Sequence, residues 1–169
     1  RNAYRSSYVF CTGYLTDYNA PYELYGYHVG QGVFGNNGSA KIAGILDGTS
    51  NTLAMGEALG NEYHMWNVWQ WGPWALSGSH VCCHGRVVIS SSSPPIRFTA
   101  AMARDWNINS PYQNDSLGRV YAWVFSSTHP GGAQFVLADG SARFLSETID
   151  YRTFCRLNFA HDGEPVGQF

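Results

Sequence analysis

Charge is scarce in this chain of 169 residues, and lysine is almost absent. Only 13% of the residues are charged, the net charge is −2, and Lys41 is the single lysine beside nine arginines. Nucleic acid is therefore not expected as a partner, because binding phosphate requires a basic surface. Low charge suits an exported domain, or a subunit that buries much of its surface in an assembly.

Long hydrophobic runs are absent as well. No stretch approaches the roughly 18 apolar residues that a membrane-spanning helix needs, and the chain begins at Arg1 without a methionine. The residues themselves thus predict no membrane anchor. The length suits a single globular domain over residues 1–169. Such a chain buries enough surface on folding that neither a metal nor a disulfide is required.

The usual spacings of metal and haem ligands are also missing. His80, Cys82, Cys83 and His84 crowd soft ligands into one short run, whereas zinc sites usually separate paired ligands by two or more residues. Haem attachment needs two residues between its cysteines, and none separates Cys82 from Cys83. We therefore expect no metal site and no cofactor.

The cysteines are few but even in number. They are Cys11, Cys82, Cys83 and Cys155. An even count in an exported protein is compatible with two disulfides. Adjacent cysteines rarely bond to each other, because the ring is strained, so the expected bridges join Cys82 or Cys83 to Cys11 or Cys155. The alternative is one bridge with two buried free thiols.

Aromatic residues and glycine are abundant instead. Aromatics make up 15% of the chain and glycines number 19, a profile typical of a β-rich exported domain with many loops. A tryptophan-rich segment contains Trp66, Trp69, Trp71 and Trp74. Tryptophan rings pack in interfaces or stack on sugars, so these residues are candidates for a subunit interface or a saccharide site. A core or loop cluster is the alternative.

Local patterns predict an α+β fold with an antiparallel sheet, long loops and a short C-terminal helix. Strands are expected at residues 8–10, 52–59 and 121–126, the last because polar and apolar residues alternate there. Asp150 is a favoured N-cap for a helix from Tyr151 to about Phe159. Residues 42–47 suit one helical turn ended by Gly48, and residues 106–118 suit a loop.

The clearest single signal is Asp139-Gly140, which lies between two short apolar runs. An Asp-Gly pair in this setting favours a hairpin with a two-residue type I′ turn, in which both central residues have positive φ. We therefore predict a hairpin over Ala133–Leu145. Phe135 and Leu137 should face one side of it and Val136 the other.

His129 lies just before this hairpin, directly followed by Pro130, Gly131 and Gly132. A histidine could act as a base or a ligand here. We expect a structural role, in which His129 holds the loop against the hairpin through hydrogen bonds. Ser126 and Ser127 are near it in sequence, but a catalytic triad depends on spatial partners that a sequence does not show.

Asp47, Gly48, Thr49, Ser50 and Asn51 form a second polar motif. Its oxygen atoms are of the kind that calcium binds, but the EF-hand spacing is absent. A turn stabilised by the bonding of Asp, Thr and Asn side chains to the backbone is the main expectation.

In order along the chain, these motifs resemble the prepilin-type H-x9-DG family, which also carries a solute-binding-type label. The matching elements are Asp47 to Thr52, Gly56-Glu57, His129 to Ala133, Ala138 to Ser141 and Val166-Gly167. The resemblance covers roughly residues 30–58 and 120–169, and residues 62–117 match no pattern of the family.

The resemblance implies an exported, non-catalytic subunit. Members resemble type II secretion pseudopilins, which have a hydrophobic N-terminal helix, and any membrane contact would pass through such a helix, absent from this chain. A pseudopilin-like head would self-associate at the cell surface or in an extracellular filament. The alternative is an extracellular module that binds a small solute or carbohydrate through Trp66–Trp74.

Overall fold

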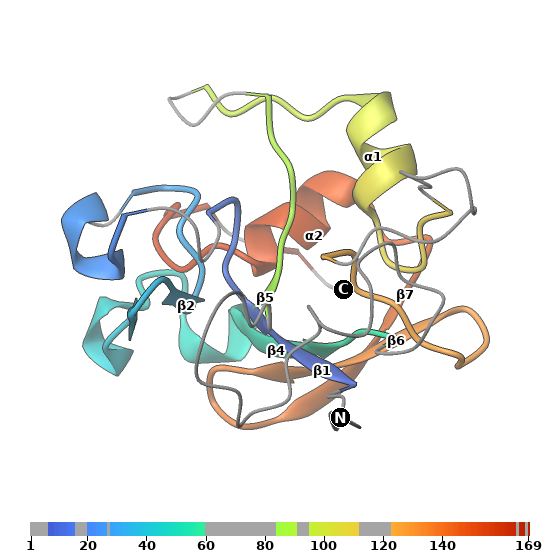
Figure 1. The fold of residues 1–169 in the computed structure, drawn as a ribbon, viewed down its shortest axis with the longest axis horizontal. Helices are drawn as coiled ribbons and strands as arrows, with labels where there is room; N and C mark the ends of the chain where they lie inside the picture. Colours follow the sequence, from blue (N-terminus) through green and yellow to red (C-terminus); the bar gives the residue numbers. More distant parts are fainter. Residues whose placement is uncertain are drawn as a thin grey trace, which may run out of the picture.

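The computed structural model describes residues 7–15, 20–26, 28–59, 84–90, 95–111, 123–164, 166–167 and 169. Its larger sheet has five strands and lies along the lower side of the view in Figure 1. The strand order is β5-β1-β4-β6-β7. These strands are β1 (Tyr8–Cys11), β4 (Leu53–Glu57), β5 (His84–Gly85), β6 (Gly132–Leu137) and β7 (Ala142–Ser146). Neighbouring strands are antiparallel, except for β1 and β5, which are parallel.

A smaller lobe and two short helices complete the described fold. The lobe holds a two-stranded sheet, β2 (Phe34–Gly35) with β3 (Gly38–Ser39), and the 3-10 helices η1 (Tyr22–Tyr25), η2 (Ile42–Gly44) and η3 (Thr49–Asn51). The α-helices are α1 (Ala100–Trp106) and α2 (Tyr151–Leu157). The predicted α+β, β-rich class is confirmed.

Helix α2 supplies much of the core. Phe154 is fully buried, and its ring lies edge-on to Phe125 and Phe135 at centroid distances of 5.7 and 5.8 Å. Such aromatic contacts add to the free energy that apolar burial contributes. The predicted cap is confirmed, since the Asp150 carboxylate accepts a hydrogen bond from the Thr153 amide at 2.9 Å.

Two of the three predicted strands are present, as β1 and β4. The third is wrong where the chain is described, because Trp123–Ser126 forms a turn, a bend and irregular backbone outside any strand. This segment crosses the ends of two strands. The Arg86 amide donates to the Trp123 carbonyl and the Ser126 amide donates to the Glu57 carbonyl, at 3.1 and 3.0 Å. With a single backbone bond at each of these strand ends, the segment forms no ladder of hydrogen bonds. Val124 and Phe125 are nevertheless fully buried.

The helical predictions also need correction at two places. Within residues 42–47, only Ile42–Gly44 form a helical turn, which is of the 3-10 type. Gly48, with φ of +91°, does not end that turn but directly precedes η3. Trp106, which was predicted to begin a loop over residues 106–118, is the last residue of α1. The Thr99 hydroxyl caps this helix by accepting a hydrogen bond from the Met102 amide at 3.2 Å.

The hairpin of β6 and β7 is confirmed, but its turn is of another type. Gly140 has φ of +87°, whereas Asp139 is not among the described residues with positive φ. The Gly140 amide donates to the Leu137 carbonyl, and the Leu137 amide donates to the Ser141 carbonyl. This is a three-residue loop with a glycine bulge, a common alternative to the type I′ turn. Phe135 and Leu137 are buried and Val136 is half-buried, as predicted.

Replacing Gly140 with valine should lower the free energy of unfolding by about 2 kcal/mol, because β-branched residues resist positive φ. The space around a side chain at this position is open, so the cost arises from the backbone alone. Gly140→Asn is the matched control, since asparagine tolerates this conformation. Urea denaturation should find the asparagine variant close to wild type. Equal losses in the two variants would contradict the assigned turn.

The predicted disulfides from Cys11 and Cys155 are wrong. Both residues are fully buried and carry free thiols. Each belongs to the main hydrophobic core, where a free cysteine packs as a small apolar side chain. Burial raises the pKa of each thiol, well above the ordinary range for Cys11, so both thiols are held in the neutral form.

Several predictions fall outside the described residues. These are the tryptophan-rich segment Trp66–Trp74, His80, the pair Cys82 and Cys83, and residues 112–122. Within the described part of the chain, no helix has the length and apolarity that crossing a bilayer requires.

Candidate functional site

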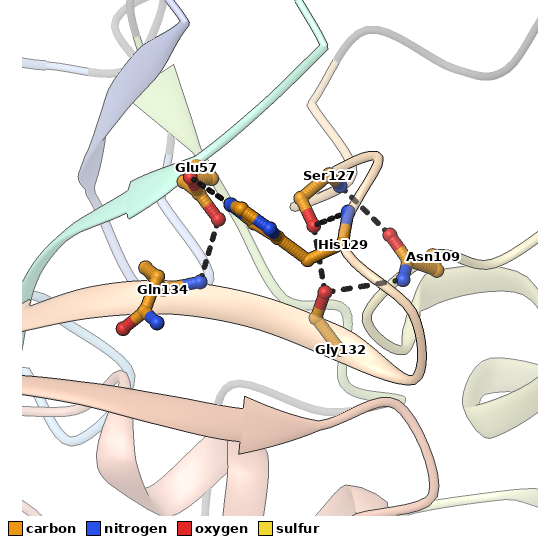
Figure 2. Close-up of polar contacts among 6 residues, drawn as sticks. All are labelled: Glu57, Asn109, Ser127, His129, Gly132 and Gln134. Carbon is orange, nitrogen blue, oxygen red and sulfur yellow. Dashed lines mark hydrogen bonds and ion pairs between the residues drawn. The ribbon is translucent and has the colours of Figure 1, made fainter.

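The Glu57 carboxylate contacts His129 and Gln134 in the cluster shown in Figure 2. Glu57 is the last residue of β4, and its side chain is only 14% exposed. One carboxylate oxygen accepts a hydrogen bond from the Gln134 amide at 2.7 Å, and the other lies 3.4 Å from His129 Nε2. The Glu57 carbonyl accepts a hydrogen bond from the Ser126 amide. The Glu57 side chain therefore takes the place of its main chain as the hydrogen-bond partner of β6, at the Gln134 amide.

Ser127 and Asn109 hold the loop that leads into β6. The Ser127 hydroxyl donates to the Gly132 carbonyl at 2.7 Å and accepts from the His129 amide at 3.0 Å. The Asn109 side chain accepts a hydrogen bond from the Ser127 amide at 2.8 Å (Figure 2). It also donates to the Glu147 carboxylate at 2.9 Å. Sequence reasoning missed Asn109. Its φ of +56° is a conformation in which asparagine is enriched.

The cluster does not form a serine-type catalytic arrangement. The Ser127 hydroxyl meets the backbone of His129 and not its ring, and the Ser126 hydroxyl accepts a hydrogen bond from the Leu59 amide at 3.1 Å. The imidazole of His129 is 55% exposed and faces Glu57. A histidine–carboxylate pair can exchange protons, but here the carboxylate also binds a backbone amide.

Gly132 is required at the start of β6 by its close approach to β7. A side chain at this position would place its Cβ 2.0 Å from the Leu145 carbonyl oxygen. Gly131 is required for its backbone, because its φ is +81° while the space around it is open. The two adjacent glycines of the motif thus serve different purposes.

At the other end of β6, Asp139 bonds within its own turn. Its carboxylate accepts hydrogen bonds from the amide and hydroxyl of Ser141 at 2.8 and 2.7 Å, and the pKa of Asp139 is lowered, mainly by that hydroxyl. The Asp139 amide donates to the Thr49 carbonyl at 3.1 Å. The structure therefore brings the Asp47–Asn51 motif to this turn, while His129 lies at the opposite end of the strand.

Asp47 joins its motif to the loop after α2. Its two carboxylate oxygens accept hydrogen bonds from the backbone amides of Gly163 and Asp162, at 2.7 and 3.0 Å. Within the motif, the Asn51 side chain donates to the Asp47 carbonyl at 3.3 Å, and the Thr52 hydroxyl donates to the Gly48 carbonyl at 3.1 Å. The contact with residues 162–163 was not predicted from the sequence.

Among the residues that the structure describes, no group of three or more histidine, cysteine, aspartate or glutamate side chains is placed to hold a metal. The oxygen-rich Asp47 motif uses its carboxylate on backbone amides instead. Asp162 lies next to it with a pKa raised to about 6, first by burial and then by the nearby Asp47 carboxylate.

Asp162→Asn should stabilise the protein near pH 8 by about 1 kcal/mol, a figure that allows for solvent screening at a half-buried position. The pKa of Asp162 is higher in the folded than in the unfolded state, so folding favours the protonated carboxyl. The contribution of this group to the free energy of unfolding of wild type therefore decreases as pH rises from about 4 to above 6. Arg156, Glu164, His161 and Asp47 also act on this region. The measurement is therefore the difference between variant and wild type in urea at pH 4 and pH 8. A difference independent of pH would contradict the assignment.

Comparison with known proteins places the chain by family alone. No curated protein and no solved structure matches it. A family model described as a protein of unknown function (DUF1559), with the label SBP_bac_10, matches residues 4–152. The matched range also spans residues 62–117, for which sequence analysis found no family pattern. Since the family model covers most of the sequence, the chain belongs to the DUF1559 family, a prepilin-type, pseudopilin-like group.

Proposed function

We propose that the protein is a non-catalytic, pseudopilin-like structural subunit that is exported and assembles with copies of itself. The observation that supports this is the use of the motif side chains. Glu57 and Asp47 bind backbone amides of segments distant from them in the sequence. Ser127, which lies just before the His129 motif, binds the Gly132 carbonyl within that motif. These motifs therefore stabilise a head of defined shape, as a structural subunit requires.

Exposed apolar side chains on the smaller lobe support the assembly part of the proposal. Leu24, Ile42 and Leu46 are 75%, 76% and 65% exposed. They come from η1, from η2 and from the turn that follows η2. Burying one such side chain in an interface contributes about 2 kcal/mol. A specific interface between copies would have to cover about 1,000 Å² or more, so further residues would take part.

Sedimentation velocity at tens of micromolar tests this proposal. Wild type should sediment as a species larger than one chain. Ile42→Asp should shift the population toward the monomer, because a buried unpaired charge in an interface is strongly unfavourable. Ala101→Asp is the matched control, since it introduces the same charge at an exposed position of α1 and should leave assembly unchanged.

Two outcomes would contradict the proposal. A strictly monomeric wild type would refute self-association through this head. A monomer that binds an oligosaccharide, and loses that binding when Trp66 and Trp69 are replaced, would favour the carbohydrate-binding alternative.

A further inference from the structure

A cavity of about 340 Å³ lies outside the cluster around Glu57 and outside the Asp47 turn. Its walls come from two neighbouring segments of the smaller lobe, residues 22–31 and 39–41, and from His161 in the loop after α2. The lining residues are Tyr22, Glu23, Gly26, Gln31, Ser39, Ala40, Lys41 and His161. Small-molecule sites usually begin at about 300 Å³, so this cavity suits a small ligand. None of the motifs that define the family resemblance supplies a residue to it.

The inner wall of the cavity carries a buried amide. Gln31 is 1% exposed, and its Nε2 donates to the Tyr22 carbonyl at 2.9 Å. Its Oε1 is buried and accepts no hydrogen bond from the part of the chain that the structure describes. Burying an acceptor without a donor is costly. The amide is therefore suited to accept a hydrogen bond from an ammonium or hydroxyl group that enters the cavity.

Tyr22 fixes the position of this wall. Its hydroxyl donates to the Gly32 carbonyl at 2.9 Å and lies 3.3 Å from His161 Nε2. Its side chain packs on the β2–β3 sheet at Gly35 and Gly38, where any added Cβ would lie 2.8 Å from it. The wall is thus tied both to the lobe and to the loop after α2.

Two opposite charges line the same cavity without pairing. Glu23 lies in η1 and Lys41 directly precedes η2. Neither takes part in the ion pairs found among the described residues. Lys41 is also the only lysine in the sequence. The cavity consequently offers acceptors at Glu23 and Gln31, and donors at Lys41 and the Ser39 hydroxyl.

We propose that this cavity binds a small zwitterion of the α-amino acid class. Its ammonium group bonds to the Glu23 carboxylate and to Gln31 Oε1. Its carboxylate bonds to the Lys41 ammonium and the Ser39 hydroxyl. Charge-assisted hydrogen bonds of this kind are the strong ones, and a ligand with both charges uses all four groups. The proposal is independent of self-association.

Isothermal titration calorimetry on the full chain tests it, with each common L-amino acid as a separate probe. At least one should bind saturably. Acetate and methylammonium, each of which keeps one of the two charges, should bind at least about tenfold more weakly, since losing one charge-assisted contact costs that much. Lys41→Met should weaken amino-acid binding by about tenfold, whereas the matched control Arg97→Met, an exposed charge outside the cavity, should not.

Three results would overturn the proposal. The first is the absence of binding by every amino acid, which would leave the Gln31 acceptor to an ordered water. The second is an equal effect of Lys41→Met and Arg97→Met. The third is binding of a neutral monosaccharide as tight as that of any amino acid, which would show that the two charges do not select the ligand.

Discussion

Replacing Gly132 with alanine should lower the free energy of unfolding by at least about 3 kcal/mol, near the upper end for single substitutions. The added Cβ would lie 2.0 Å from the Leu145 carbonyl oxygen and 2.8 Å from the Phe144 ring. Gly132 pairs with Ser146 in the sheet, so relief requires the two strands to separate. The Gly132 carbonyl also accepts the Ser127 hydroxyl bond, which would be strained by the same movement.

Gly131→Ala is the matched control for this prediction. It adds the same methyl group one residue earlier, where φ is +81° and space is open. The expected loss is about 1–2 kcal/mol, the cost of a left-handed conformation for an L-residue. Urea denaturation followed by circular dichroism measures both variants. A Gly132→Ala variant no less stable than Gly131→Ala would show that β6 and β7 do not approach each other as described.

Asp47→Ala should lower the free energy of unfolding by about 2–3 kcal/mol. The carboxylate accepts hydrogen bonds from the Gly163 and Asp162 amides, and hydrogen bonds to a charged acceptor contribute about 1.5–3 kcal/mol each when they are shielded from water. The Gly163 bond is solvent-exposed, so the sum is smaller than two full contributions. Losing both bonds frees residues 162–163 from Asp47, while the Leu46 amide still donates to the Ala160 carbonyl at 2.8 Å.

Asp47→Asn separates shape from charge at this position. The amide side chain keeps one acceptor oxygen of similar placement but has no charge, so about half the loss is expected. Thermal or urea unfolding at pH 7 measures the series. If alanine and wild type unfold together, the Asp47 carboxylate does not hold the loop, and its oxygen atoms would be free for another role.

Local signals in the sequence predicted the parts of the fold that depend on neighbouring residues. Asp139-Gly140 between apolar runs gave the hairpin, and Asp150 gave the start of α2. The turn type was not predictable, since the Asp139 amide bonds to the distant Thr49 carbonyl. Helix α1 has seven residues, too few for a strong periodic pattern, although the Thr99 cap was a readable signal.

The candidate site could be predicted only in part, for a similar reason. His129 was identified from its motif, but its partner Glu57 lies on another strand, and a single sequence does not show that β4 and β6 are neighbours. Alternation at residues 121–126 indicated burial correctly for Phe125 but not strand pairing. The link from Asp47 to Asp162 and Gly163 depends on how the end of α2 is placed.

Amide hydrogen exchange at Gln134, Asp162 and Gly163, measured by NMR, tests most directly whether the motif carboxylates serve the fold. These amides donate to Glu57 and Asp47. They should exchange slowly in wild type. Glu57→Ala should selectively accelerate exchange at Gln134, and Asp47→Ala at Asp162 and Gly163, beyond any change at the core amide of Phe154. Fast exchange at all three in wild type, or no selective change in the variants, would contradict the structural role proposed for this family's motifs.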